Sequence, residues 1–216
     1  MKIGAAIRVF NGRGAEFDAV VAAVSKDGVR VRVGPSRDAV SEARVIVTLA
    51  QAVLKGDKMD DVVRDAVMMG VAAIQPLVTT RSEASLAALQ RGHRQARWQR
   101  IAVSSAKQCG RAVVPAVLEP RAFKDVSSMA QAAPPGPGLI FVEPSASGDA
   151  LSLGDLDWSP PRKTTVLIGP EGGWTAEEID AGAIAYRLVT LGTRTFRADA
   201  MAIVALTALF TSWREL

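Results

Sequence analysis

The stretch "VLIGPEGGW", residues Val166 to Trp174, decides the fold of this chain. Three apolar residues run directly into a segment of three glycines, a proline and a glutamate. A continuous apolar run is typical of a parallel strand that is buried on both faces. Glycines lack Cβ and let a flat ligand approach the backbone. The stretch therefore predicts a buried strand that ends either in a ligand site or in a tight strand-to-helix turn.

Strands and helices alternate on both sides of this stretch. Apolar runs predict strands, and a 3.6-residue period predicts helices. Thr175 and Glu178 predict a capping box at the start of a helix. The expected strands are 44–50, 71–78, 112–118, 139–144, 164–170 and 187–191, and the expected helices are 58–69, 94–110, 121–133, 176–186 and 199–213. This alternation predicts an α/β fold, a mostly parallel sheet with flanking helices, and by pattern alone it predicts no knot.

The first 34 residues have a different pattern. Short β-branched segments are separated by Asn-Gly, Asp-Gly and Gly-Pro turn signals, which predicts a small sheet or part of a barrel. The polar segment "PSRDAVSEA" follows at 35–43. We therefore predict two domains, 1–41 and 42–216.

Composition excludes several classes of protein. Hydrophobic residues make up 49% of the chain, but no apolar run is long enough to predict a membrane span. Cys109 and His93 are the single cysteine and the single histidine, so no internal disulfide and no His/Cys zinc site is expected. His93 lies in a polar, basic segment, which disfavours a Ser-His-Asp triad. We expect a cytoplasmic protein without metal or membrane partners.

Positive charge is concentrated in one segment. Residues 81–124 hold nine Lys or Arg residues and two acidic residues, whereas the whole chain has a net charge of +4. Such a concentration favours a polyanionic partner, most simply a nucleic acid. Arg91, Arg94 and Arg97 follow one another at three-residue steps along one predicted helical side. A solvated helix face is the alternative for those three.

Three loops with unusual chemistry follow predicted strands. They are "FVEPSASG" at 141–148, "LIGPEGGW" at 167–174 and "TLGTRTFRAD" at 190–199. The carboxyl ends of parallel strands share one edge of a sheet, which is where ligands bind in such folds. The chain lacks the spacings of a P-loop, of a dinucleotide-binding loop and of a nucleophile elbow.

The loop motifs resemble a known family. "LIGPEGGW", followed by "LGTRTFRADAMA" at 191–202, is similar to the RsmE family of ribosomal RNA uridine methyltransferases in the SPOUT superfamily. "LKGDKMDDVVRDAVMMGV" at 54–71, "TTRS" at 79–82 and "RWQRIAVSSAKQCGR" at 97–111 add to the resemblance. It covers 44–216 and, more loosely, 7–34.

The resemblance implies a fold and an activity. The fold would be a SPOUT-type trefoil-knotted α/β domain with a small N-terminal PUA-like β domain that binds RNA. The cofactor would be S-adenosyl-L-methionine, the product N3-methyluridine in small-subunit (16S) ribosomal RNA, and the assembly a homodimer. Two alternatives stay open, namely a SPOUT methyltransferase that acts on another RNA (transfer RNA or a ribose 2′-hydroxyl), and a catalytically degenerate RNA-binding protein.

Roles for individual residues follow from the resemblance and from the chemistry of methyl transfer. Arg197 would stabilise charge on a deprotonated uracil, and Glu171 or Asp199 would accept the proton or orient Arg197. Structural ion pairing of Arg197 and helix capping by the two acids are the alternatives. The expected cofactor-binding residues are Pro144, Ile168, Gly169, Gly172, Gly173, Leu191, Gly192, Thr195 and Phe196. The expected RNA-binding residues are Arg8, Arg81, Arg94, Arg97, Gln108 and Arg111.

The sequence departs from the family pattern at four places. Phe196 replaces the usual leucine before the arginine and could equally be a core residue. The usual Arg-x-Glu-Thr-Ala motif reads Arg197, Ala198, Asp199, Ala200 and Met201 here, so the acid is one methylene shorter and the threonine is lost. Lys107 replaces a glutamate. The first strand of the barrel, with its basic stretch, is expected before Ala5 and is missing. These departures leave the glycine loops intact, so cofactor binding is expected to be retained more firmly than activity.

Overall fold

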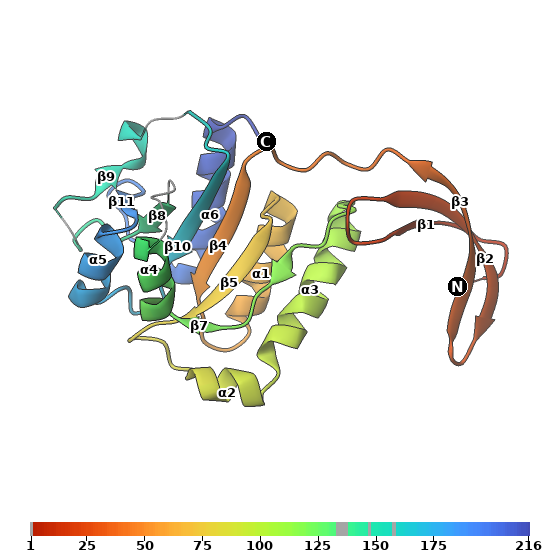
Figure 1. Ribbon diagram of the computed structural model, residues 1–216, viewed down its shortest axis with the longest axis horizontal. Coiled ribbons are helices and arrows are strands. Elements are labelled where there is room, and N and C mark those ends of the chain that lie inside the picture. Colours follow the sequence, from red (N-terminus) through yellow and green to blue (C-terminus); the bar gives the residue numbers. More distant parts are fainter. Residues whose placement is uncertain (1, 133–137, 147, 157–158) are drawn as a thin grey trace. The chain divides into compact units, whose positions relative to one another are not determined.

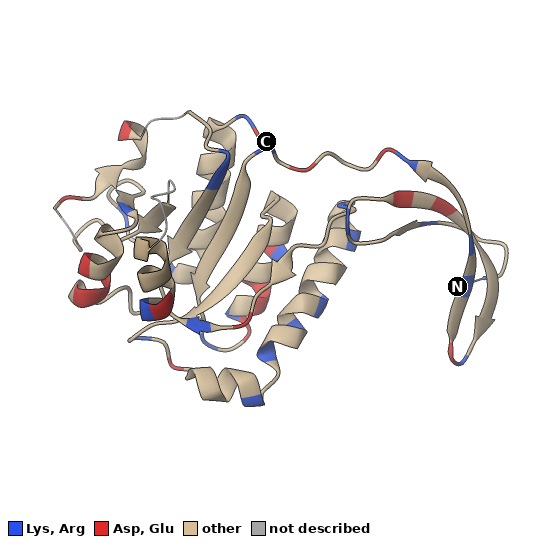
Figure 2. Cartoon of the chain, viewed as in Figure 1, with Lys and Arg blue, Asp and Glu red and all other residues tan. Residues whose placement is uncertain are grey.

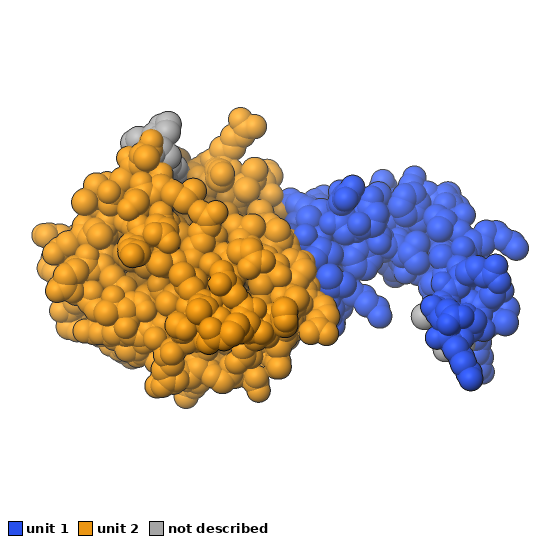
Figure 3. Space-filling view, turned by 60° about the horizontal axis from the view of Figure 1, so that its bottom comes forward, with its two compact units in different colours: residues 1–42, 103–114 blue, residues 43–102, 115–216 orange. Residues whose placement is uncertain are grey.

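The computed structural model describes residues 2–132, 138–146, 148–156 and 159–216. The chain forms two compact units, coloured separately in Figure 3. Unit 1 comprises residues 1–42 and 103–114, and unit 2 comprises 43–102 and 115–216. A segment from the middle of the chain thus joins the N-terminal strands, which a linear reading of the sequence does not predict.

Unit 1 is built on an antiparallel sheet of three strands in the order β1 (Ala6–Phe10), β2 (Glu16–Ser25) and β3 (Gly28–Arg37). These are the three strands that the turn signals predict. The inserted segment attaches through backbone contacts, since Val113 forms β-bridges with Gly12 and Arg13.

Unit 2 contains a parallel sheet in the order β6-β5-β4-β10-β8-β11-β9, with β7 paired to β5 (Figure 1). The central strand β10 pairs in parallel with both β4 and β8. The strands are β4 (Ile46–Ala52), β5 (Ala73–Val78), β6 (Ala116–Val117), β7 (Arg121–Ala122), β8 (Gly138–Phe141), β9 (Leu151–Ser152), β10 (Lys163–Ile168) and β11 (Arg187–Thr190). The predicted mostly parallel sheet is confirmed.

Helices cover both faces of this sheet. Helices α4 and α5 lie over one face, and α1 and α6 pack together on the other (Figure 1). Leu167, Ile140 and Ala50 on neighbouring strands contribute to one core cluster with Phe123 of α4 and Ile179 of α5. The helices are α1 (Lys58–Met69), α2 (Leu86–Arg91), α3 (Arg94–Cys109), α4 (Phe123–Ala132), α5 (Ala176–Ala183) and α6 (Ala198–Ser212), with a 3-10 turn at Leu153–Asp155. None of the described helices is long and apolar enough to cross a membrane.

Local signals at helix ends act as predicted. Gly70 ends α1 with φ 102, a left-handed conformation that glycine adopts without steric cost. The Thr175 hydroxyl accepts from the Glu178 backbone N–H, and the Glu178 carboxylate accepts from the Thr175 N–H, so the capping box is present.

Three predictions about elements are wrong. The expected strand 112–118 shrinks to Ala116–Val117, because Pro115 lacks an N–H and the residues before it join unit 1. The expected helix at 121–133 is present as α4, but its predicted start is wrong, because the helix begins at Phe123 after the short strand β7. Residue 133 lies outside the described residues. The three arginines at 91, 94 and 97 do not share one helix, because α2 ends at Arg91 and His93 breaks the path with φ 48.

Candidate active site

The three loops predicted to share one edge of the sheet do meet there. They surround a cavity of about 270 Å³ at the carboxyl ends of β8, β10 and β11. The cavity is lined by Phe141, Val142, Glu143 and Pro144 from the first loop, by Ile168, Gly169, Pro170, Glu171, Gly173 and Trp174 from the second, and by Leu191, Arg194, Thr195, Phe196 and Arg197 from the third. Lys58 of α1 and the first turn of α6, with Ala198, Asp199 and Met201, complete the lining.

The glycine loop has a conformation that side chains would not tolerate. Gly173 has φ 68 and donates its N–H to the Pro170 carbonyl at 2.9 Å, which closes a tight turn. A Cβ on Gly173 would lie 3.1 Å from Glu143 Oε1 on the neighbouring loop. A Cβ on Gly169 would lie 3.1 Å from the Trp174 ring, whose Nε1–H donates to the Phe141 carbonyl at 2.9 Å. The glycines thus let two loops and an indole pack closely around the cavity.

Two predicted cofactor residues lie outside the lining. A Cβ on Gly172 would meet Arg81 rather than the cavity, at 3.3 Å from the Arg81 Cβ. Gly192, with φ 66, has open space around its would-be Cβ and is not part of the lining. Both glycines shape their loops, whereas the other seven expected cofactor residues line the cavity.

Arg81 holds the glycine loop from outside. Its Nη1 donates to the Gly172 carbonyl at 2.6 Å and to the Trp174 carbonyl at 3.1 Å. Arg81 is exposed and only its Nη1 is engaged by these two carbonyls, so a role of Arg81 in RNA binding stays a prediction.

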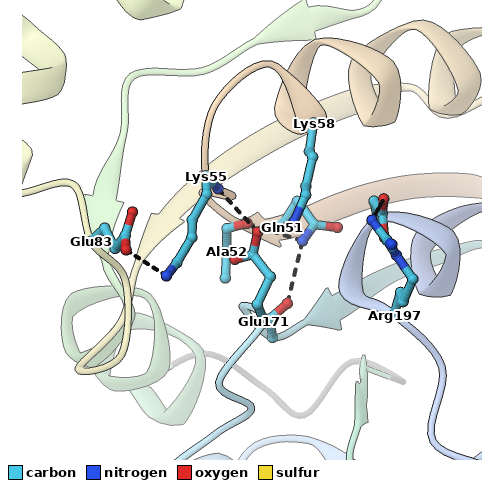
Figure 4. A network of polar contacts seen from close by, with 9 residues as sticks. Gln51, Ala52, Lys55, Lys58, Glu83, Glu171 and Arg197 are labelled. Carbon is cyan, nitrogen blue, oxygen red and sulfur yellow. Dashed lines mark hydrogen bonds and ion pairs between the residues drawn. The ribbon is translucent and has the colours of Figure 1, made fainter.

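Glu171 is held by groups from the β4–α1 region (Figure 4). Its Oε1 accepts from Lys58 Nζ at 2.9 Å and from the Lys55 backbone N–H at 3.1 Å. Partial burial alone raises the pKa of Glu171, but the hydrogen bonds from Lys58 and from backbone N–H groups outweigh it, so the pKa is lowered. Glu171 therefore stays ionised at neutral pH and is a weak proton acceptor.

Arg197 precedes α6 and pairs with Asp199 in its first turn. Arg197 Nε and Nη2 lie 3.1 and 2.9 Å from the two carboxylate oxygens, a two-pronged pair. The hydrogen bond from Arg197 lowers the pKa of Asp199, against a smaller effect of partial burial. The Arg197 side chain is 74% exposed, so the guanidinium remains open to a substrate above the cavity.

Lys58 and Arg194 also line this site, although the sequence motifs assign no role to either. The Lys58–Glu171 pair joins segments 113 residues apart, which no local spacing predicts. The motif "LKGDKMDD" at 54–61 is the one available signal, because it places two lysines directly after a buried strand. As a whole, the site combines apolar walls, bare backbone, carboxylates and three cations.

Two family models match the chain. An RNA methyltransferase domain matches residues 41–210, and an RNA methyltransferase PUA domain matches residues 1–34. The chain is 31% identical over 169 residues to the ribosomal RNA small subunit methyltransferase E of Mesomycoplasma hyopneumoniae, covering 77% of this chain and 70% of that protein. The chain belongs to the ribosomal RNA small subunit methyltransferase E family.

Two further proteins of this family are similar to the chain, one in sequence and one in structure. The methyltransferase E of Synechocystis sp. is 34% identical over 172 residues, and the match covers 77% of this chain but only 53% of that relative. A crystal structure of methyltransferase E from Neisseria gonorrhoeae, bound to S-adenosyl methionine, superposes with a TM-score of 0.89 at 28% identity, covering 99% of this chain and 86% of the other. The predicted SPOUT-type sheet and PUA-like strands are thereby confirmed.

The predicted RNA-binding residues of this family member lie in different settings. Arg8, Arg94 and Gln108 present partly or fully exposed side chains, Arg8 with a loose pairing to Glu16 at 3.7 Å. Arg97 is paired with Asp57 at 3.1 Å and with Asp60. Its charge is therefore already balanced within unit 2.

The predicted RNA-binding role of Arg111 needs correction. Its side chain is 7% exposed and forms a two-pronged pair with Glu42 inside unit 1. A buried guanidinium engaged in this way holds the inserted segment to Glu42, in the segment that follows β3, and does not face RNA.

We expect Arg111→Met to destabilise the protein by about 2 kcal/mol, because it leaves the Glu42 carboxylate without its buried partner. Urea unfolding measures the change. Arg37→Met is the control, since the Arg37–Asp18 pair of the same unit is half-exposed and contributes little to stability. Equal losses in the two variants would contradict a special role for the buried pair.

RNA affinity is expected to fall steeply with salt, with a log–log slope of about −3 to −5 for about four to six phosphate contacts. Figure 2 shows basic residues along α3. Arg97→Gln should leave the slope unchanged, because Asp57 and Asp60 already balance that charge. Arg91→Gln should make the slope shallower by about one, since Arg91 is exposed and has no ion pair with any residue that the structure describes. Filter binding at several salt concentrations measures the slopes. Equal slopes for the two variants would contradict the assignment of Arg91, and not Arg97, to phosphate binding.

Metal ligands do not gather in the part of the chain that the structure describes, which contains no cluster of three or more His, Cys, Asp and Glu residues suited to an ion. His93 lies in the exposed turn between α2 and α3. This placement fits the solvated surface histidine that its basic sequence setting suggests.

Proposed function

We propose that this chain methylates N3 of a uridine in small-subunit (16S) ribosomal RNA, with S-adenosyl-L-methionine as the methyl donor. The observation that carries the proposal is the three-loop cavity with Arg197 at its edge, in a chain of the methyltransferase E family. The S-adenosyl methionine bound to the related Neisseria structure supports the choice of cofactor.

The residues of the cavity suit this cofactor. Apolar side chains of Ile168, Leu191 and Phe196 can wall an adenine ring, and the bare backbone at Gly169 and Gly173 can approach its edge. The carboxylates of Glu143 and Glu171 complement a molecule that carries ammonium and sulfonium charges. When bound, S-adenosyl-L-methionine supplies an electrophilic methyl group. The chain's own residues must then position and activate the uracil.

Arg197 is the group we assign to uracil activation. Loss of the N3 proton leaves negative charge on N3, O2 and O4, and a fixed guanidinium stabilises that charge as it develops. The lowered pKa values of Glu171 and Asp199 disfavour both as proton acceptors. We infer that Asp199 orients Arg197, that Lys58 and Glu171 fix the glycine loop, and that the proton leaves to solvent.

Several further features belong to the same proposal. Unit 1, with Arg8 and Gln108, would bind the RNA together with Arg94 of unit 2. The functional division would follow residues 1–41 and 42–216, except that the inserted segment 103–114, which carries Gln108, would act with unit 1. The last third of the chain would carry the trefoil knot, and the protein would act in the cytoplasm as a homodimer. The names of the relatives, which specify small-subunit ribosomal RNA, do not favour transfer RNA as the substrate.

The test uses 16S ribosomal RNA that lacks the modification. The protein and S-adenosyl-L-methionine carrying a labelled methyl group should transfer label to one uridine, and mass spectrometry of the digested RNA should identify N3-methyluridine. Calorimetry with the cofactor alone separates the two halves of the proposal. Cofactor binding without transfer would favour a degenerate RNA-binding protein, and absence of both would overturn the proposal.

A further inference from the structure

A second cavity lies in unit 2, on the opposite side of the Lys55 loop from the candidate active site. It measures about 350 Å³, a size within the range of about 300–1,000 Å³ for sites that take small ligands. Three segments line it, namely the loop after β4, the loop before α2 with α2 itself, and the start of α3. The lining comprises Val53, Leu54, Lys55, Gly56, Glu83, Ala84, Ala88, Leu89, Arg94 and Trp98.

The chemistry of this cavity suits a nucleotide. Its floor is apolar, with Leu54, Leu89 and Trp98 all at least 95% buried. Arg94 and Lys55 add two cations, of which Lys55 is ion-paired with Glu83. A flat ring on an apolar floor with cations beside it is how proteins hold an unstacked base and its phosphate.

The Trp98 indole adds an unused donor. Among the residues that the structure describes, Trp98 Nε1 is buried and has no hydrogen-bond acceptor. An indole N–H can only donate, and a buried donor without an acceptor is costly. Trp98 lines the cavity, and its unused donor favours a ligand with an acceptor, such as a base carbonyl or ring nitrogen.

Lys55 connects this cavity to the candidate active site. Its backbone N–H donates to Glu171 of the glycine loop, while its side chain extends the other way to Glu83 (Figure 4). The side chains of Lys55 and Glu83 are both more than half exposed, so their ion pair is weak. A phosphate can therefore replace Glu83 as the partner of Lys55 at little cost in free energy. A strand of RNA with its target base at Arg197 would thus find a second site one loop away.

We propose that this cavity, named here the Trp98 pocket, binds an unstacked nucleotide that flanks the target uridine in single-stranded RNA. Arg94 and Lys55 contact its phosphate, and the base lies on Leu54, Leu89 and Trp98. This inference rests on the proposed function, because it assumes that the substrate is RNA.

The first experiment fills the pocket. Ala88 and Ala87 are neighbours on the exposed side of α2, but only Ala88 lines the pocket. Ala88→Phe should raise the KM for 16S RNA about tenfold, the scale of one lost base-stacking contact, and leave cofactor affinity unchanged. Ala87→Phe, the matched control, should change KM by less than about twofold. Equal KM values for the two variants would overturn the proposal.

A second pair of variants tests the cation without altering the core. Arg94→Gln should weaken RNA binding about five- to tenfold, whereas Arg100→Gln on the same helix, which lies outside the pocket, should weaken it about twofold or less. Equal effects would assign Arg94 to the general basic surface and overturn its role here.

A binding measurement keeps the proposal testable if no methyl transfer is detected. The probe is a single-stranded oligouridine hexamer, titrated into protein labelled with 15N at the tryptophan indoles, with Trp98→Phe identifying the Trp98 signal. The hexamer should shift the Trp98 Nε1–H resonance in wild type and not in Ala88→Phe. Binding of the hexamer without that shift would overturn the proposal, as would an equal shift in Ala88→Phe. Absence of transfer with the shift present would overturn only the proposed function.

Discussion

Replacing Arg197 with alanine is expected to slow methyl transfer by about 10²-fold or more while leaving S-adenosyl-L-methionine affinity within about twofold of wild type. Arg197 acts on charge that appears only when uracil N3 loses its proton, so ground-state binding need not suffer. Its exposed guanidinium is held by Asp199 and contributes little to the stability of the fold. Single-turnover transfer of labelled methyl to 16S RNA and calorimetry with the cofactor measure the two quantities.

The pH dependence gives a second readout for Arg197. Both nearby carboxylates have lowered pKa values, so their interactions are fully present above the ordinary carboxylate range and are lost only in more acidic solution. Between about pH 6 and about pH 10 they do not titrate. In this range the wild-type rate should level off at a lower pH than the residual rate of Arg197→Ala, because the guanidinium stabilises the N3 anion and so lowers the pH at which the uracil loses its proton.

Two controls sharpen this prediction. Arg197→Lys keeps the charge but loses the two-pronged geometry toward Asp199, and an intermediate rate is expected. Arg194→Ala removes another cation from the lining of the same cavity and should affect the rate less. Full activity in Arg197→Ala, or a loss explained by lost cofactor binding, would leave Arg197 as the structural partner of Asp199.

Gly173→Val is expected to abolish cofactor binding, with at least about a hundredfold loss of affinity. The position has φ 68, which costs a residue other than glycine about 1–2 kcal/mol. A branched Cβ would also come too close to Glu143 Oε1 and displace that side chain, which lines the cavity. Calorimetry with S-adenosyl-L-methionine measures the loss, and circular dichroism checks that the fold persists.

Gly148→Val is the matched control, because a Cβ at Gly148 meets nothing within 4 Å and its φ is ordinary. It should bind the cofactor within about twofold of wild type. Gly172→Val makes a useful third variant, since its Cβ would displace Arg81 without entering the cavity, and a milder loss is expected. Tight cofactor binding by Gly173→Val would contradict a role of the glycine loop in cofactor binding and leave it as a strand-to-helix turn.

The sequence by itself determined the layout of unit 2 and the place of its candidate site. Apolar runs that alternate with amphipathic helices require a parallel sheet covered on both faces, and parallel strands put their following loops on one edge. The loops after β8, β10 and β11 are therefore assigned to one cavity by the order of strands and helices along the chain. The helix ends can also be predicted from the sequence, since the Thr175–Glu178 capping box and the Gly70 helix end depend only on residues close by in the chain.

Tertiary structure alone decided the partners of the charged side chains. Glu171 meets Lys58, Arg97 meets Asp60, and Arg111 meets Glu42, across separations of 113, 37 and 69 residues. Spacing along the chain carries no information about such pairs, because they form only where packed elements bring distant side chains within hydrogen-bond reach. Packing also placed residues 103–114 with the N-terminal strands and turned Arg81 toward the carbonyls of the glycine loop. Sequence patterns determine which backbone segments become neighbours, while the three-dimensional packing of side chains determines which charges remain free to meet a substrate.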